Sequence, residues 1–398
     1  MKLARDVVII DYLRSPFSRA NPKTPEKDLL NGWIMPEALG KLWVELLKRN
    51  NIDPKEVDET VVGTANPVLE NFTFGGKFPA FFAKLPFNCA SQQVDQQCGS
   101  ALDGLRTGVM AIASGFADTV LCGGMEHMTH IPMGGGGAIK FPEKLMTDPG
   151  YTAYIDLMFS VNMGFTAQKL QEMGEISRDE MDKWSFRSHQ RAAAAKEWLK
   201  GEILPLEITL PDGSKQMFDY DANVRPDTTL EALAGLKPAY KADGTITAGN
   251  ASPLNAGATS MLIMSRDKAK KLGLKPKASF VSFGVAGVDP TIMGTGPVPS
   301  SEKALEYAGL KAKDIDVWEI NEAFAVVTLY AIKKFGLDPE KVNIKGGAVA
   351  IGHPLGSSGI RLVGTAMRIL KEVKGKYGLG TMCVGGGQGT AAIIKNES

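Results

Sequence analysis

The stretch Gly346-Gly347-Ala348-Val349-Ala350-Ile351-Gly352-His353-Pro354-Leu355-Gly356-Ser357-Ser358-Gly359 contains one of only four histidines in a chain of 398 residues. An apolar run, residues 348–351, leads into His353, and a helix-like segment, residues 360–373, follows it. This order predicts that His353 lies at the end of a strand, where the next helix begins and catalytic groups often sit. A tight turn with an incidental histidine is the alternative, and this stretch alone does not decide between them.

Upstream of this stretch, short apolar runs alternate with segments of helical spacing. Residues 7–10, 60–62, 88–94 and 119–122 are expected to be strands, and a helix is expected over residues 101–114. Strands that alternate with helices indicate a largely parallel sheet covered on both faces, so the predicted fold class is α/β.

The alternation of strand-like and helix-like segments stops at residue 125. From there to about residue 250, a glycine run is followed by predicted helices with charged faces. One of these helices starts with the capping-box pattern Ser177-Arg178-Asp179-Glu180. We interpret residues 125–250 as an inserted loop domain that covers the core and binds a ligand. Residues 1–124 and 251–275 then form the first α/β half, and residues 276–398 form the second.

Composition excludes several classes of protein. The 45 basic and 44 acidic residues leave a net charge of +1, which does not favour nucleic acid or a membrane as a partner. Four cysteines are too few for a disulfide framework and match no zinc spacing, so no metal is expected. The N-terminal residues resemble neither a signal nor a transit peptide, and a cytoplasmic location is expected.

A faint internal repeat relates the two halves. Residues 57–62 resemble residues 315–320, and each copy runs on to a glycine-containing turn and a helix. The helices are followed by strands that end in Cys122-Gly123-Gly124 and in Cys383-Val384-Gly385-Gly386. A duplicated α/β unit would place Cys98 and His353 at matching corners, although chance similarity in glycine-rich sequence is the alternative.

Cys98 and His353 suggest nucleophilic chemistry at these corners. A cysteine close to a helix N-terminus is expected to favour its thiolate, and His353 is the natural acceptor for the thiol proton. Such a cysteine can accept an acyl group as a thioester and pass it on. The alternative for Cys98 is a small residue buried under a helix.

Together these features resemble the thiolase family over essentially the whole chain. The motifs that carry the resemblance are Val94-Asp95-Gln96-Gln97-Cys98-Gly99-Ser100, Thr247-Ala248-Gly249-Asn250-Ala251-Ser252, Asn321-Glu322-Ala323-Phe324-Ala325, Gly352-His353-Pro354-Leu355-Gly356 and Cys383-Val384-Gly385-Gly386-Gly387. The resemblance implies two related five-stranded α/β halves that form a five-layered core, with a loop domain inserted in the first half.

The resemblance also implies roles for individual residues. Cys98 would be the acylated nucleophile, His353 its base, and Cys383 the acid/base at the α-carbon. Asn321 would hold a water that, with His353, forms one oxyanion hole, and the backbone of Cys98 and Gly385 would form a second. The residues expected to contact substrate or coenzyme A are Ser252, Arg225, Met163, Ala323, Phe324 and His127.

The implied activity is ping-pong acyl transfer to coenzyme A, the co-substrate, with no tightly bound cofactor. A degradative 3-ketoacyl-CoA thiolase, handling 3-ketoacyl-CoA, acyl-CoA and acetyl-CoA as a homodimer or homotetramer, is the leading interpretation. A biosynthetic acetoacetyl-CoA thiolase, a ketoacyl synthase and a non-catalytic acyl-CoA-binding protein are the alternatives.

Three further residues carry expectations of their own. Asp95 stands where the family usually has asparagine, and its charge would disfavour a Cys98 thiolate if it faced the site. Asn162 replaces the histidine common in biosynthetic members. His189 is expected on a solvated helix face.

Overall fold

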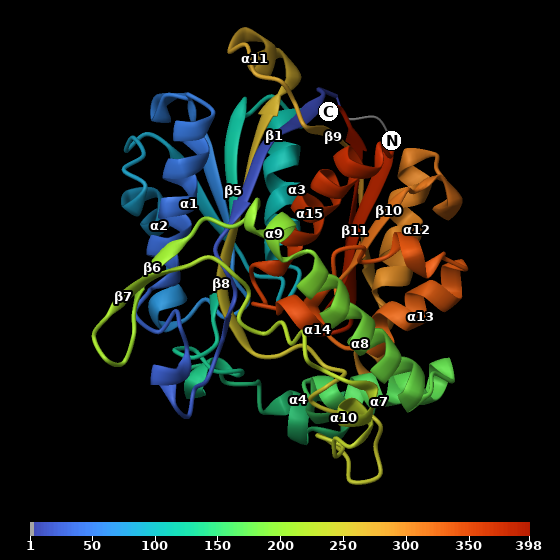
Figure 1. Cartoon of the computed structure of the whole chain (residues 1–398). Coiled ribbons are helices and arrows are strands. Elements are labelled where there is room, and N and C mark those ends of the chain that lie inside the picture. Colours follow the sequence, from blue (N-terminus) through green and yellow to red (C-terminus); the bar gives the residue numbers. More distant parts are fainter. Residues whose placement is uncertain (1–3) are drawn as a thin grey trace.

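The computed structural model describes residues 4–398. One bent, ten-stranded sheet runs through the centre of the molecule (Figure 1). The sheet order is β10-β11-β12-β9-β1-β8-β5-β3-β4, with the short strand β2 paired to β8. Its strands are β1 (Val7–Arg14), β2 (Ser18–Arg19), β3 (Glu59–Gly63), β4 (Ala90–Val94), β5 (Thr119–His127), β8 (Asn255–Ser265), β9 (Ala278–Gly287), β10 (Val317–Ile320), β11 (Tyr377–Val384) and β12 (Gln388–Asn396).

The strand order is symmetric about the junction of β1 with β9, which pair antiparallel. Moving outward, β8, β5 and β3 on one side correspond to β12, β11 and β10 on the other. Each side therefore contains parallel pairs, β3 with β5 and β10 with β11, next to antiparallel ones. The internal repeat predicted from residues 57–62 and 315–320 corresponds to β3 and β10, at equivalent places in the two halves.

Two central helices separate the two halves of the sheet, and further helices cover their outer faces (Figure 1). The result is a five-layered α/β/α/β/α arrangement, as expected. The helices of these layers are α1 (Met35–Arg49) and α2 (Lys77–Phe82) outside the first half, α3 (Ser100–Ala113) and α15 (Ser358–Val373) in the centre, and α12 (Pro297–Ala308) and α13 (Ala325–Phe335) outside the second half.

The central helices are buried on most sides, which explains their composition. Apolar side chains from α3, α15 and both halves of the sheet form one core cluster. The helices approach closely at Gly359, where a Cβ atom would lie 2.5 Å from the backbone nitrogen of Leu102. Arg361 is also fully buried in α15, and its Nη1 donates to Glu319 Oε2 at 2.7 Å, because a buried charge needs a partner.

The prediction of a strand immediately before His353 is wrong. Residues Ala348–Ile351 form a single helical turn, α14, in which Gly347 O accepts the backbone N–H of Ile351 at 2.8 Å. The second half therefore has four regular strands, and in place of a fifth only Val342 forms an isolated bridge, to Trp318. Four apolar residues suit a buried turn as well as a buried strand, so their pattern did not separate the two.

The inserted segment leaves the sheet at the end of β5 and returns at β8. Because β5 continues to His127 and β8 starts at Asn255, the boundary drawn before residue 125 falls inside a strand. The segment contains α4 (Lys144–Thr147), α5 (Pro149–Thr152), α6 (Leu157–Ser160), α7 (Met163–Gly174), α8 (Arg178–Ala194), α9 (Lys196–Lys200), the hairpin β6 (Leu206–Thr209) and β7 (Lys215–Phe218), and α10 (Leu230–Ala234). The Ser177–Glu180 capping box is present at the start of α8.

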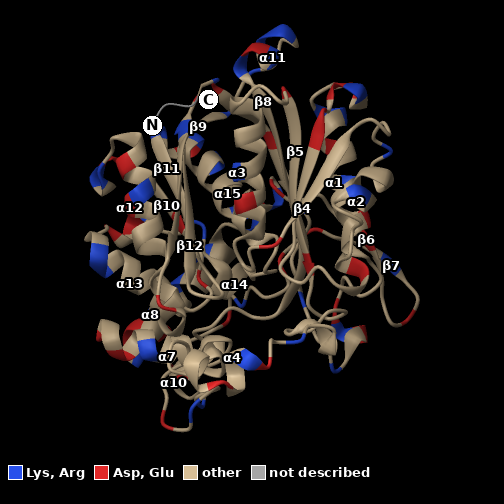
Figure 2. Ribbon diagram, turned by 180° about the vertical axis from the view of Figure 1, so that it is seen from behind, with Lys and Arg blue, Asp and Glu red and all other residues tan. Residues whose placement is uncertain are grey.

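Lys, Arg, Asp and Glu lie mainly on the outer helices and loops, and the sheet carries few of them (Figure 2). Basic and acidic residues alternate over these elements, in agreement with the near-zero net charge. The short helix α11 (Arg266–Lys271) connects the two halves and projects beyond the sheet. Within residues 4–398, no helix is both long and apolar enough to cross a membrane.

Candidate active site

Cys98 lies between the end of β4 and the start of α3 and is half-buried. Gln97, immediately before it, has a φ of +48°, a conformation that costs energy for a residue other than glycine and is found mostly where the surrounding structure imposes it. Ala65, Met128 and Leu355 form an apolar cluster against the Cys98 side chain. Cys98 therefore follows a residue in a strained conformation and packs against buried apolar side chains.

His353 is 3 % exposed, and the turn around it fixes its ring from both nitrogens. Its backbone N–H donates to Asn255 Oδ1 at 2.7 Å, next to Gly352, whose φ of +116° only glycine adopts without strain. The ring Nδ1 lies 2.6 Å from Ser358 Oγ, the first residue of α15. Because Ser358 Oγ donates its own hydrogen to Pro354 O at 3.0 Å, it accepts from Nδ1–H, and Nε2 is left as the basic nitrogen.

Asn321 and Cys383 come from the second half of the sheet and lie close to the same point. Asn321 follows β10, is fully buried, and places its Nδ2 3.3 Å from His353 Nε2. Its Oδ1 has no partner within the described residues. Cys383 lies in β11 and is 1 % exposed, and the Cys98 sulfur is close enough to raise its pKa electrostatically.

The protonation states of the resting site are set mainly by burial. Burial is the main cause that raises the pKa of the Cys98 thiol to about 11; the backbone N–H groups of Gly385 and Cys98 oppose it by donating to the sulfur, and the charge of Glu126 adds to it. Burial, with Arg361, lowers the pKa of His353 to about 3. The thiolate expected for Cys98 is therefore disfavoured in the free protein, and the imidazole of His353 is neutral near pH 7.

Several residues predicted to contact the substrate are linked to one another in the structure. The backbone N–H of Ser252 donates to Ala323 O at 3.0 Å, and Ala251 forms an isolated antiparallel bridge with Phe324. Met163, the first residue of α7, packs with Phe324 and Cys383 in one apolar cluster. The segments that carry Ser252 and Ala323 are therefore joined through their backbones, and Met163, Ala323 and Phe324 share an apolar cluster with Cys383.

Arg225 is exposed in the inserted segment, and His189 supports its backbone. The Arg225 N–H donates to His189 Nδ1 at 3.2 Å, and His189 itself is only 6 % exposed. The expectation that His189 faces solvent is therefore wrong. Burial, followed by the charge of Arg225, lowers the pKa of His189 to about 4, so that the ring is neutral and can accept this hydrogen bond.

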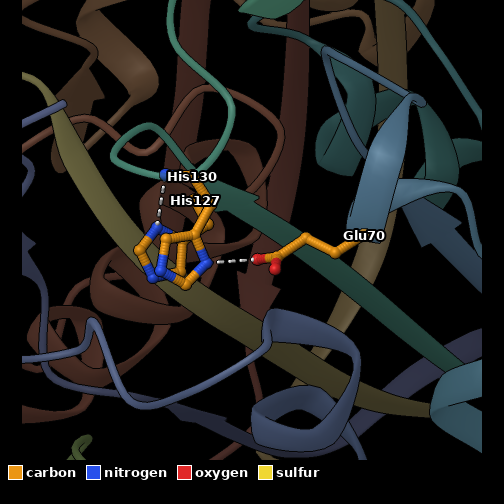
Figure 3. A group of neighbouring side chains, drawn as sticks. All are labelled: Glu70, His127 and His130. Atoms are coloured by element: carbon orange, nitrogen blue, oxygen red, sulfur yellow. Dashed lines mark hydrogen bonds and ion pairs between the residues drawn. The ribbon is translucent and has the colours of Figure 1, made fainter. Parts of the chain in front are cut away.

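His127 is not brought to the substrate side of the site. It has no exposed surface, its Nε2 bonds to Leu30 O at 3.2 Å, and its ring stacks on His130 with centroids 3.7 Å apart (Figure 3). Together with Glu70, these histidines form the one group within residues 4–398 whose ligand atoms could hold a metal ion. The nearly parallel rings direct their lone pairs side by side rather than toward one point, and His130 Nδ1 is already bonded to Glu70 at 2.8 Å.

Asp95 does not face Cys98, contrary to the concern that its charge would act there. It is exposed, and its carboxylate accepts the backbone N–H of Gln97 at 2.9 Å. Its charge instead raises the pKa of Glu126. Asn162 caps α7 by accepting the N–H of Phe165 at 3.2 Å.

Glu126 is the main residue that sequence reasoning missed. This fully buried carboxylate accepts the backbone N–H groups of Ala65 at 2.8 Å and Gly356 at 3.0 Å, and the side-chain amide of Asn71 at 2.7 Å. It therefore ties the wall beside Cys98 to the turn that carries His353. Burial raises its pKa to about 7. A charged residue inside an apolar strand was the available signal.

Glu322 performs a similar task for the inserted segment. Its carboxylate accepts from Trp184 Nε1 at 2.9 Å and Ser188 Oγ at 2.8 Å on α8, and from Asn343 Nδ2 at 2.7 Å. It also accepts the backbone N–H of Val349 at 3.1 Å in the turn before His353. The inserted helix α8 is thereby anchored to the catalytic turn.

These elements define an α/β protein of two similar halves, each contributing reactive groups to one buried site. The family model for the N-terminal domain of thiolase matches residues 7–267, and the model for its C-terminal domain matches residues 274–396. The chain belongs to the thiolase family.

Relatives and solved structures agree over the full length of the chain. The 3-ketoacyl-CoA thiolases of Marinobacter nauticus and Vibrio parahaemolyticus are each 40% identical to it, over 98% of both chains. Human mitochondrial 3-ketoacyl-CoA thiolase in complex with CoA superposes with a TM-score of 0.87 at 34% identity, covering 100% of both chains. The acetyl-CoA acetyltransferase of Bacillus anthracis superposes with a TM-score of 0.85, also at 34% identity and with 100% of both chains covered.

Proposed function

We propose that this protein is an acetyl-CoA C-acyltransferase that cleaves 3-ketoacyl-CoA with coenzyme A, releasing acetyl-CoA and a shortened acyl-CoA. The observation that carries the proposal is that Cys98, from the first half, lies near Gly385 and Cys383 of the second half, where Asn321 Nδ2 is also 3.3 Å from His353 Nε2. The full-length similarity to 3-ketoacyl-CoA thiolases supports the same activity.

In the first half-reaction, His353 Nε2 accepts the proton of Cys98 as the sulfur attacks the 3-keto carbon. The oxyanion that develops at C3 is stabilised by the backbone N–H groups of Cys98 and Gly385, and Asn321, through a water, together with His353 stabilises the thioester oxygen. The bond between C2 and C3 then breaks, and the Cys383 thiol protonates the α-carbon. Acetyl-CoA leaves, and the rest of the acyl chain remains on Cys98 as a thioester.

In the second half-reaction, Cys383 is a thiolate because it has given up its proton. It accepts the thiol proton of an incoming coenzyme A, whose sulfur attacks the Cys98 thioester. The acyl-CoA product leaves, and the Cys98 sulfur recovers its proton from His353. Both cysteines have elevated pKa values in the free protein, so each returns to a neutral thiol after turnover.

We propose that coenzyme A lies along Ser252, Ala323, Phe324 and Met163, with Arg225 near its phosphates. This placement is supported by the contacts of these residues near Cys383 and by the exposure of Arg225. An Arg225→Gln variant should raise KM for coenzyme A with little change in kcat. A change in kcat alone would contradict the assignment.

Assays of two variants test the reaction. Cys98→Ser should abolish both thiolysis and covalent acylation, while Cys383→Ala should abolish turnover and leave partial acylation of Cys98, detectable by mass spectrometry of the intact protein. Cys122→Ala is the matched control, because Cys122 is buried in β5 beneath α3. Undiminished thiolysis by Cys383→Ala would remove this residue from the mechanism.

A degradative role with longer 3-ketoacyl chains is our preferred assignment, because the 40% identical relatives are 3-ketoacyl-CoA thiolases. A biosynthetic acetoacetyl-CoA thiolase is the second candidate, favoured by the segment Asn250-Ala251-Ser252 and by the similarity to the acetyl-CoA acetyltransferase. Thiolysis measured across a chain-length series separates them: a preference for acetoacetyl-CoA alone would favour the second.

We also propose that the protein works in the cytoplasm as a homodimer or homotetramer. All four cysteines are free, as expected in a reducing compartment. Within the described residues β4 is an edge strand, and next to it lies an exposed group of phenylalanines, namely Phe72, Phe74, Phe78 and Phe81. Light scattering after size exclusion should give a multimer that Phe78→Asp weakens, and a monomeric parent would refute this assembly.

A further inference from the structure

A basic hollow of about 440 Å³ lies at the opposite end of α15 from the catalytic turn. It is bounded by the ends of α1 and α15, by β1 and by the residue before β9. Four cationic side chains line it, Arg49, Lys277, Arg368 and Lys371, and Asp11 is the one carboxylate among its lining residues.

Asp11 neutralises only part of this charge. Its buried carboxylate accepts from Arg49 Nε and Lys277 Nζ, and also from Asn50 Nδ2 at 2.9 Å. Arg49 otherwise donates through Nη2 to Tyr12 O at 2.7 Å, which leaves its Nη1 available. Lys277 keeps two further ammonium hydrogens and is 46% exposed.

Arg368 and Lys371 complete the hollow from the last turns of α15. Arg368 is held in place by Glu202 Oε2 at 3.1 Å and by Trp198 O at 2.9 Å. Lys371 is exposed and its ammonium has no ion pair or hydrogen bond within residues 4–398. The hollow therefore combines two prepositioned guanidinium groups with two ammonium groups that have donors to spare.

The charge balance identifies the class of ligand. Four cations line the hollow, and with the carboxylates of Asp11 and Glu202, which pairs with Arg368, they leave a net charge of +2, whereas the entire chain carries +1. Concave surfaces lined by one sign of charge concentrate the field and attract counter-ions. Guanidinium and ammonium groups together suit phosphate oxygens, whereas a ligand with a single carboxylate would leave half of the excess charge uncompensated.

We propose that this hollow is a binding site for a compact polyphosphate anion, such as inorganic pyrophosphate or the diphosphate of a nucleotide. The site is separate from the one proposed for coenzyme A. The ten residues of helix between Ser358, which bonds to His353, and Arg368 correspond to about 15 Å. The proposal does not depend on the thiolytic activity, because it rests on the lining of this hollow alone.

Calorimetric titration with pyrophosphate at low ionic strength, on protein saturated with coenzyme A, tests the proposal. The parent protein should bind one equivalent. Lys371→Gln should weaken binding about fivefold and Lys371→Glu about twenty-fivefold, since a surface charge pair contributes about 1 kcal/mol and each factor of ten corresponds to about 1.4 kcal/mol. Because Lys371 is exposed, neither change should affect folding, which the thermal midpoint will check.

Lys341→Gln is the matched control, because Lys341 is an exposed lysine outside the hollow. It removes the same net charge and should change the dissociation constant less than twofold. Equal weakening by Lys341→Gln and Lys371→Gln would show nonspecific attraction, and competition with coenzyme A would place pyrophosphate in the nucleotide site. Either result, or no binding by the parent protein, would overturn the proposal.

Discussion

Ser358 provides a sensitive test of how the catalytic imidazole is held. Its Oγ accepts the Nδ1–H of His353 at 2.6 Å and donates to Pro354 O, so it favours the tautomer in which Nε2 is the base. Ser358→Ala removes this acceptor and leaves a buried N–H without a partner. The other tautomer, protonated on Nε2, then becomes competitive and cannot accept the Cys98 proton.

The expected magnitude follows from the burial of both groups. A lost neutral hydrogen bond with an unpaired buried donor costs about 1–3 kcal/mol, which corresponds to a decrease in kcat/KM of about 5- to 150-fold. Thiolysis of acetoacetyl-CoA by Ser358→Ala should fall by this factor, mainly in kcat. Because the chain has only four histidines, ¹⁵N NMR of histidine-labelled protein can follow the tautomer of His353 directly, with a His353→Asn variant for assignment.

Ser357→Ala is the control, since Ser357 is an equally buried neighbour whose Oγ lies 3.4 Å from Thr259 Oγ1 and makes no hydrogen bond to His353. It should retain turnover within about twofold and keep the Nδ1–H signal. If Ser358→Ala keeps both its kcat and the Nδ1–H tautomer, the role assigned to Ser358 is refuted. A fall in kcat with an unchanged tautomer would equally contradict it.

Three further outcomes are expected. Burial raises the pKa of Glu126 to about 7 in the folded state, above its value in the unfolded chain. The folded state therefore binds a proton more tightly than the unfolded state, and the protein loses stability as the pH rises from about 4.5 to about 7. Denaturant unfolding should show a loss of up to about 3 kcal/mol from about pH 4 to about pH 8 relative to the Glu126→Gln variant. Glu322→Gln leaves one acceptor oxygen for Trp184 and its other donors, and should lower the free energy of unfolding by about 2–4 kcal/mol, whereas an effect below 1 kcal/mol in urea would argue against the anchor. The hydrogen bond to Glu70 is the main cause that raises the pKa of His130. The pair should therefore stabilise the protein below about pH 6.5, and this stabilisation should be lost as the pH rises through the folded pKa of His130. Glu70→Gln should abolish this pH dependence of the thermal midpoint, and an unchanged dependence would exclude the pair as its cause.

The fold could be predicted where local pattern and tertiary environment agree. The runs at residues 7–10 and 60–62 are fully or largely buried strands, and the helical spacing after Gly359 corresponds to α15. The strand prediction for residues 348–351 failed because four consecutive apolar residues are equally compatible with a buried helical turn and with a buried strand. In the structure this turn packs on Glu322, which accepts the backbone N–H of Val349 and leaves no room for a Cβ at Gly347, and such a contact with a distant residue does not show in the local pattern.

Some features of the candidate site could likewise be predicted from the sequence, and others could not. Cys98 and His353 stood out because their glycine-rich surroundings are unusual and repeat in the chain. Their protonation states could not be read from the sequence, since burial outweighs the nearby helix terminus for Cys98. His189 looked solvated from its charged neighbours, but α8 turns it inward, where it supports Arg225.

The symmetric sheet has a consequence for how activity could be divided. The proposed nucleophile, Cys98, belongs to the half that ends at β8 and the proposed base, His353, to the half that starts at β9, and the helix α11 connects the two halves. Two polypeptides separated within α11 would each keep a contiguous set of strands but only part of the reactive groups. Such fragments are candidates for split-protein complementation, in which ketoacyl-CoA cleavage would report reassembly along β1 and β9.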